Sequence, residues 1–390
     1  MIRSVLAYAK YMTAAMADPT VRAMVLSHAK GTVGGTVDRH AALGAAVGYL
    51  LRAQQQGSDV GMGSYHLSKG WGASYPETTG YAIPTLLAAS KVLGWSEPRA
   101  AAMAAVDWLL TIQRADGGWQ GGRVGEGRPS IVFNTAQVVR GLLAAHTVTQ
   151  RTDLLEAALR AGRWIASVQD ADGAWRTSNF MGAARVYDTY VDAPLLWLHA
   201  LTGEEDLRSA ALRNLEWVIQ QRQENGWFAN ADNTLKHNGR PITHTIAYTL
   251  DGLIECSTRS SDDRYLKAAR SAALILAEDF LINGRLNGRY DATWRGTEHP
   301  IMTGCAQLAI VWSRLYAISA DDRFHEAHER MVAFLVSVQR LSDQGPSAVH
   351  GALPGSFPLW GRYEKFAFPN WGTKYFADAL LCAEGHPPVF

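Results

Sequence analysis

The segment Trp108-Leu-Leu-Thr-Ile-Gln113-Arg-Ala-Asp-Gly117-Gly-Trp119 decides the fold, because the same phrase returns along the chain. A second clear copy is Trp164-Ile-Ala-Ser-Val-Gln169-Asp-Ala-Asp-Gly173-Ala-Trp175. Weaker copies begin at Tyr49, Trp217, Phe280 and Phe334. Copies spaced by roughly 55 residues indicate six structural repeats that bury their apolar faces only against their neighbours.

Each repeat predicts two helices. An acidic or hydroxyl-bearing start such as Ser261-Asp262-Asp263 precedes each phrase, and such residues cap helix amides. A polar and aromatic loop follows each phrase, and then comes a helix that is apolar nearly all round, which is typical of a buried helix. These second helices are expected at 81–93, 135–145, 189–201, 245–256, 303–316 and 373–382.

The pattern predicts an all-α chain: an (α/α)6 toroid of six helical hairpins, with an inner barrel of six helices and an outer ring of six. We expect a single toroid domain at 36–390 and an N-terminal helical cap at 1–35. Ile2, Val5 and Leu6 recur at helical spacing, with Lys10 off that stripe. This first helix is expected to pack on the ring, with a weak membrane-surface anchor as the alternative.

Composition excludes several classes of function. The 37 Lys and Arg residues nearly cancel the 36 Asp and Glu residues, and no basic run suggests a nucleic-acid partner. No stretch reaches the roughly 20 apolar residues of a transmembrane segment. Cys256, Cys305 and Cys382 follow no disulfide or metal-ligand spacing, which favours free thiols and a cytoplasmic location. The twelve histidines form no metal constellation, so no metal and no cofactor is expected.

The phrases Gln113-x-x-x-Gly117-x-Trp119 and Gln169-x-x-x-Gly173-x-Trp175 are similar to the QW repeats of the squalene-cyclase and prenyltransferase superfamily. This resemblance implies an α/α toroid. The Asp-x-Asp-Asp motif of the protonating cyclases and an Asp-Asp-x-x-Asp metal motif are both absent. The loops also resemble those of sugar-active toroids such as uronyl C5-epimerases, polysaccharide lyases and unsaturated-glucuronyl hydrolases, which implies a carbohydrate substrate.

In such a ring, the six long loops and the amino ends of the six inner helices gather at one rim. Helix amino ends that converge there favour an anionic ligand, such as a sugar carboxylate. His244 and Tyr248 are four residues apart and therefore share one helix face. Asp188 and Asn134 occupy positions where helix N-caps are also expected. The predicted catalytic residues are His244, Tyr248, Tyr190, Asn134, Glu77 and Asp188.

The remaining polar and aromatic residues of the rim are predicted to bind substrate. Aromatic faces stack on pyranose rings, and cations neutralise a carboxylate. The predicted substrate-binding residues are Tyr75, Arg185, Tyr187, Tyr290, Asp291, His299, Trp360, Asn370, Trp371 and Lys374.

The leading hypothesis is a carbohydrate-active enzyme that abstracts the C5 proton of a uronic-acid-containing oligo- or polysaccharide, giving epimerisation or elimination. That chemistry needs a base, an acid and a group that neutralises the carboxylate. His244 or Tyr248 is assigned as base, Tyr190 or Tyr290 as acid, and Asn134 with Arg185 or Lys374 as neutraliser. The alternatives are a glycoside hydrolase with a carboxylate pair, an isoprenoid cyclase-like enzyme and a non-catalytic glycan-binding toroid.

Overall fold

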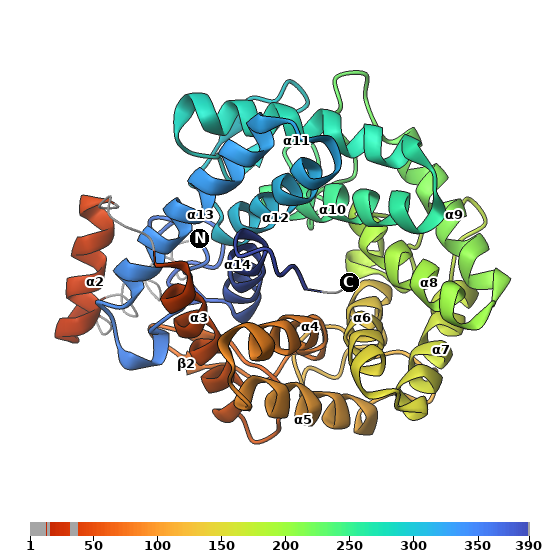
Figure 1. The fold of residues 1–390 in the computed structure, drawn as a ribbon, viewed down its shortest axis with the longest axis horizontal. Helices are drawn as coiled ribbons and strands as arrows, with labels where there is room; N and C mark the ends of the chain where they lie inside the picture. Colours follow the sequence, from red (N-terminus) through yellow and green to blue (C-terminus); the bar gives the residue numbers. More distant parts are fainter. Residues whose placement is uncertain (1–12, 14–15, 32–37, 389–390) are drawn as a thin grey trace.

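The computed structural model describes residue 13 and residues 16–31 and 38–388, and shows a closed ring of helices in two concentric layers (Figure 1). The predicted (α/α)6 toroid is confirmed. The outer helices are α3 (Arg39–Gln55), α5 (Glu97–Thr111), α7 (Thr152–Ser167), α9 (Glu205–Gln220), α11 (Asp263–Asn283) and α13 (Asp322–Ser342). The inner helices are α4 (Pro76–Leu93), α6 (Val132–Thr149), α8 (Thr189–Thr202), α10 (Thr243–Ser260), α12 (Met302–Ser319) and α14 (Asn370–Ala383).

The inner helices contact one another in chain order, and α14 returns to contact α4. Each inner helix also packs against the outer helix that follows it, and α14 packs against α3. The last repeat therefore closes onto the first. In this order α4 and α10 are three helices apart, so they stand on opposite sides of the barrel.

The glutamine of the repeated phrase joins neighbouring repeats. Gln113 Nε2 donates to the carbonyl oxygen of Gly117 at 2.8 Å and to that of Ala157, on the next outer helix, at 2.9 Å. Gln169 repeats the arrangement with Gly173 and Ala210, both at 2.8 Å. Gln54 likewise donates to one carbonyl in its own loop and to one on the next outer helix. Gln339 does the same, and its partner on the next outer helix is Ala42 of α3.

The glycine and tryptophan of the phrase have equally local roles. Gly117 has φ +93°, and a Cβ there would lie 2.8 Å from the Arg160 carbonyl oxygen, so a side chain would be both strained and obstructed. Trp119 and Trp175 are fully buried, and their ring N–H groups donate to the outer-helix carbonyls of Leu109 and Ile165. They pack within the layers of the ring, so they are unavailable for substrate.

In the described part of the chain, the loops contain five strands of two residues each. β1 (Tyr65–His66) pairs antiparallel with β2 (Gly70–Trp71) and with β5 (Ala367–Phe368), placing Tyr65 opposite Trp71 and Phe368. β3 (Arg289–Tyr290) pairs antiparallel with β4 (Gly296–Thr297). Three short 3-10 turns, Phe180–Gly182, Val186–Asp188 and Ser347–Val349, complete the loops. The strands tie the long rim loops to one another.

The expectation that the inner helices are apolar nearly all round is wrong. Arg140 of α6 pairs with Glu255 of α10 at 2.7 Å, and Lys374 pairs with Asp378 on α14 at 2.7 Å. Arg314 also pairs with Asp251 at 2.8 Å. Arg140, Glu255, Lys374 and Asp378 are almost completely buried and Arg314 is partly buried, so these charges require partners inside the protein. The sequence alone does not reveal whether a single charged residue in an apolar helix points to solvent or pairs with another charge inside the protein.

Several inner helices also begin earlier than predicted. α4 begins at Pro76 and α6 at Val132, so polar residues expected in loops form the first helical turn. Proline in the first turn fits because it lacks the amide that would be unpaired there. This shift places Glu77 and Asn134 inside helices rather than before them.

Helix α2 (Pro19–Lys30) lies outside the ring beside α13 (Figure 1). Its Met24 side chain is fully buried. The predicted first helix, with Ile2, Val5 and Leu6, falls outside the described residues. The described helices include none that is long and apolar enough to cross a membrane.

Candidate active site

A cavity of about 310 Å³ lies at the amino ends of the inner helices. Four inner helices contribute to its wall: α4, α6, α10 and α14. Long loops complete it. The lining residues are Tyr75, Glu77, Thr78, Tyr81, Gly122, Arg123, Glu126, Arg128, Phe133, Asn134, Phe180, Tyr187, Asn233, His244, Thr245, Tyr248, Tyr363, Glu364 and Trp371. Seven predicted site residues therefore share this cavity: Tyr75, Glu77, Asn134, Tyr187, His244, Tyr248 and Trp371.

Glu77 is a buried carboxyl group in the first turn of α4, with 9% of its surface exposed. Burial raises its pKa to about 7, because the ionised form loses hydration, while a hydrogen bond with Tyr75 acts in the opposite direction. The Tyr75 hydroxyl in turn accepts from Asn134 Nδ2 at 3.1 Å. Hydrogen bonds thus connect Asn134 to Tyr75 and Tyr75 to Glu77, whose pKa lies near neutral pH.

His244 occupies the opposite side of the barrel, in the first turn of α10, and is 8% exposed. Its Nδ1 lies 2.7 Å from Oε1 of Gln307 on α12. Burial lowers the pKa of His244 to about 4, so the ring is neutral at pH 7. When Gln307 Oε1 accepts the Nδ1 proton, Nε2 carries the free lone pair of a base.

Aromatic rings form much of the cavity wall. Tyr248 lies 4.6 Å from the His244 ring and 5.2 Å from Phe133, measured between ring centroids. Phe133 meets Tyr187 edge-on, also at 5.2 Å. Trp371 Nε1 donates to the Tyr363 hydroxyl at 3.0 Å, which fixes the orientation of both rings. These faces suit a ligand with an apolar surface and polar edges, such as a pyranose.

The loops add charged groups that the sequence did not single out. Arg123 and Arg128 reach the cavity from the loop after Trp119, and Glu126 pairs with Arg128 at 2.7 Å. Glu364 brings a second carboxyl group whose pKa is raised by burial, an effect that Arg123 and Lys69 oppose. The only sequence signal was the cluster of glycines at 121–127, which marks an irregular loop rather than a binding role.

Three predicted residues near α8 do not line the cavity. Tyr190 lies beneath Tyr248, with ring centroids 4.7 Å apart, and Arg140 stacks on it at 4.3 Å. Asp188 is fully buried and accepts from Asn179 Nδ2 at 2.7 Å. Arg185 is also fully buried. These side chains lie in the interior behind the cavity wall, at and just before the start of α8.

Two predicted residues of α14 are structural for a similar reason. Asn370 Nδ2 donates to the backbone carbonyls of Met62 and Gly63, at 3.0 and 2.9 Å. Lys374 is fully buried, pairs with Asp378 and lies 4.0 Å over the Tyr375 ring. Neither Asn370 nor Lys374 is among the residues that line the cavity.

The remaining predicted residues lie elsewhere on the rim loops. The Tyr290 hydroxyl donates to Asp279 at 2.5 Å, and the Asp291 carboxylate accepts the amide of Thr293 in a tight turn. His299 lines a separate cleft. Trp360 packs half-buried on the core. Spacing along the chain placed these residues at the rim but did not show which way their side chains point.

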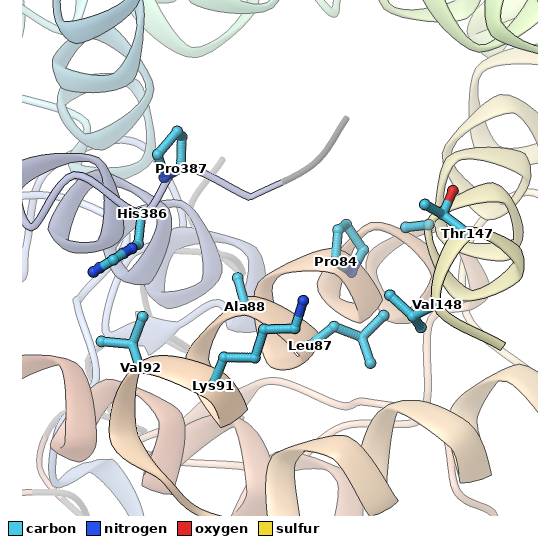
Figure 2. Close-up of a pocket in the computed structure, with 10 residues that line it drawn as sticks. Pro84, Leu87, Ala88, Lys91, Val92, Thr147, Val148, His386 and Pro387 are labelled. Atoms are coloured by element: carbon cyan, nitrogen blue, oxygen red, sulfur yellow. The ribbon is translucent and has the colours of Figure 1, made fainter.

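The other end of the barrel has a different character. Figure 2 shows a pocket there between α4, α6 and the chain after α14, lined by Pro84, Leu87, Ala88, Lys91, Val92, Ala144, Thr147, Val148, His386 and Pro387. Only Lys91 and His386 are ionisable among these residues. The convergent acid and base groups are therefore at the amino ends of the inner helices.

Fold and cavity together define a helical toroid with a polar and aromatic cavity at the mouth of its inner barrel. The chain is similar to squalene-hopene cyclase of Zymomonas mobilis, at 31% identity over 152 residues, which span 35% of this chain and 20% of that protein. The match thus reaches about a fifth of the relative's length. No family model matches the chain.

Solved structures share the fold over most of the chain. An unsaturated glucuronyl hydrolase from a Bacillus species has a TM-score of 0.69 at 16% identity, covering 88% of this chain and 97% of that chain. Cellobiose 2-epimerase from Bacillus thermoamylovorans has a TM-score of 0.70 at 14% identity, covering 87% and 96%. At these identities the comparison establishes the toroid alone.

Proposed function

We propose that this chain is a carbohydrate-active enzyme that moves a proton at C5 of a uronic-acid residue. One observation carries the proposal: a buried carboxyl group, Glu77, and a neutral buried imidazole, His244, line one aromatic cavity from opposite sides of the barrel. Two proton-transfer groups on opposite walls can reach the two faces of a pyranose held between them. Acid and base groups act best when their pKa lies near the working pH.

In the proposed reaction, His244 Nε2 takes the C5 proton, and the electron pair is delocalised into the sugar carboxylate as an enediolate. Glu77 then gives its proton to C5 from the opposite face, which inverts that carbon. Solvent removes the proton from His244 and restores the proton of Glu77. If Glu77 instead protonates the departing oxygen at C4, the same intermediate gives elimination.

A base whose pKa is about 4 is weak, so the step depends on stabilising the enediolate. Arg123 and Arg128 lie at the cavity and supply positive charge for the sugar carboxylate. They replace Arg185 and Lys374 in that role. Tyr187, Tyr248 and Trp371 would stack on or flank the ring and exclude water.

The similar toroids support a sugar substrate, since they include an unsaturated glucuronyl hydrolase specific for heparin and a cellobiose 2-epimerase. A glycoside hydrolase is the second candidate, because Glu364 brings another carboxyl group of raised pKa to the same cavity. An isoprenoid substrate would fit the aromatic wall and the similarity to a cyclase, but it gives no role to the charged loop residues of the cavity.

The first experiment is a screen of purified protein against uronate-containing polysaccharides in heavy water. Deuterium at C5 with inversion identifies epimerisation, and a new 4,5-unsaturated uronate identifies elimination. New reducing ends without deuterium at C5 would favour the hydrolase. An absence of reaction with every uronate, together with turnover of a prenyl diphosphate or a linear isoprenoid, would contradict the proposal.

A further inference from the structure

A second cavity, which we name the basic cleft, lies in the rim loops and has a volume of about 530 Å³. Its wall comes from the loop before α10, from the loop between α11 and α12, and from the loop before β5. The residues that matter here are Arg240, Arg285, Asn287, Glu298, His299 and Arg362. Its lining is therefore polar, unlike that of the pocket in Figure 2.

Positive charge exceeds negative charge in the basic cleft. Glu298 is the one carboxylate on its wall, and it already pairs with Arg362 at 3.1 Å and with Arg289 at 3.4 Å. Nearby Asp232 is fully buried and pairs with Arg289 at 2.8 Å. Within residues 16–31 and 38–388, no ion pair involves Arg240 or Arg285, and the side chains of both are exposed. Two guanidinium groups are thus available to an anion.

The basic cleft is a close neighbour of the candidate active cavity. Arg362 lies on the cleft, and the next two residues, Tyr363 and Glu364, lie on the cavity. On the other side, Arg240 precedes His244 by four residues. The Tyr363 ring lies 5.8 Å from the His244 ring, so the same two segments separate the two spaces. A glycan that extends from the cavity across residues 362–364 would therefore enter the cleft.

We propose that the basic cleft binds a second anionic group, a carboxylate or sulfate, on a glycan whose reacting uronate occupies the cavity. The inference rests on the proposed function and names its substrate class as a polyanionic oligosaccharide. The planar guanidinium of arginine matches carboxylate and sulfate oxygens in a two-pronged hydrogen bond. Neutral oligosaccharides lack the group that Arg240 and Arg285 would hold.

Calorimetric titration tests the inference without requiring turnover. The probes are a sulfated heparin tetrasaccharide, a non-sulfated tetrasaccharide of uronic acid, and neutral cellotetraose. The double variant Arg240→Ala and Arg285→Ala is compared with Arg99→Ala, an exposed arginine on α5. We expect the double variant to lose at least about tenfold in affinity for one or both anionic probes, while Arg99→Ala binds as the parent protein does.

The outcomes separate the two proposals. If the double variant binds both anionic probes as tightly as the parent, the basic cleft is not a subsite, whatever the activity of the protein. The same conclusion follows if cellotetraose binds as well as the charged probes. If affinity falls as expected while no uronate is turned over, the cleft proposal stands and the catalytic proposal fails.

Discussion

The imidazole Nδ1 of His244 lies 2.7 Å from the side-chain oxygen of Gln307, across the interface between α10 and α12. This contact occupies one of the two ring nitrogens and leaves the other free to accept a proton. Because Gln307 accepts the Nδ1 proton, the proposed base is Nε2. We predict that Gln307→Leu lowers kcat by about tenfold to a hundredfold and leaves KM within a few-fold, since the contact orients the base without touching substrate.

A charged substitution at the same position gives the matched test. Gln307→Glu should raise the pKa of His244, because a carboxylate stabilises the imidazolium. The acid limb of the pH profile of kcat/KM should then shift to higher pH. An unchanged profile in both variants would show that Gln307 has only a packing role.

The two pKa shifts predict a bell-shaped pH profile for the unmodified enzyme. His244 must be neutral to accept a proton, and its pKa is about 4, so kcat/KM should fall as pH drops through about 4. Glu77 must hold a proton to donate it, and its pKa is about 7, so kcat/KM should fall as pH rises through about 7. Initial rates between pH 3 and 9 check both limbs, and activity that keeps rising above pH 8 would contradict the roles.

Tyr75 tunes the alkaline limb. Its hydrogen bond lowers the pKa of Glu77, against the larger effect of burial. Tyr75→Phe should therefore raise the pKa of Glu77 and move the alkaline limb above pH 7, with the acid limb unchanged. If instead the acid limb moves, the Tyr75 hydroxyl acts on another group.

Asp188 was a catalytic candidate, and its burial now predicts a structural role. Asp188→Asn should leave turnover within about threefold, because the side chain does not line the cavity and an amide oxygen can still accept from Asn179. Burial raises the pKa of Asp188 from 3.8 to about 8. The folded state therefore holds this proton, and the associated stability is present below about pH 4 and is lost as pH rises to about 8.

Thermal unfolding measures this effect. Between pH 5 and 8 the melting temperature of the parent protein should fall more than that of Asp188→Asn, which cannot ionise. A hundredfold loss of turnover in a well-folded Asp188→Asn variant would restore a catalytic role for this residue.

Gln339 closes the ring by donating to Ala42 at 3.0 Å and to Gly351 at 2.9 Å. Gln339→Ala removes both of these buried hydrogen bonds, so we expect a loss of roughly 1–3 kcal/mol in the free energy of unfolding. Gln220→Ala, at an exposed position of α9, is the control and should change stability by less than about 0.5 kcal/mol. Equal stability of the two variants would mean that closure does not depend on this side chain.

The sequence predicts the ring well because its glutamine, glycine and tryptophan each make a local contact that recurs. Gln113 and Gln169 bind equivalent carbonyls in successive repeats, so the repetition in sequence is a repetition in structure. The repeat spacing also places the amino ends of the inner helices at one rim, and Glu77, Asn134 and His244 were candidates for that reason. The helices expected at 81–93, 135–145 and 245–256 nevertheless began too late to include these three residues.

The rest of the site depends on contacts between distant segments. Lys374 and Arg123 are both single cations near an aromatic residue in the sequence, but only the fold pairs Lys374 with Asp378 and brings Arg123 to the cavity. Tyr363 and Glu364 lie in an irregular loop that has no helical period to orient them. Long-range pairing of this kind leaves no pattern in a single sequence.

The most direct measurement is the rate at which solvent deuterium enters C5 of a uronate oligosaccharide. With the parent protein we predict incorporation with inversion, and with His244→Ala or Glu77→Gln a rate lower by at least about a hundredfold, in variants that keep the parent melting behaviour. The Arg99→Ala variant should exchange at the parent rate. Deuterium exchange at a near-parent rate in both site variants, or cleavage of the glycan with no deuterium at C5, would contradict the account.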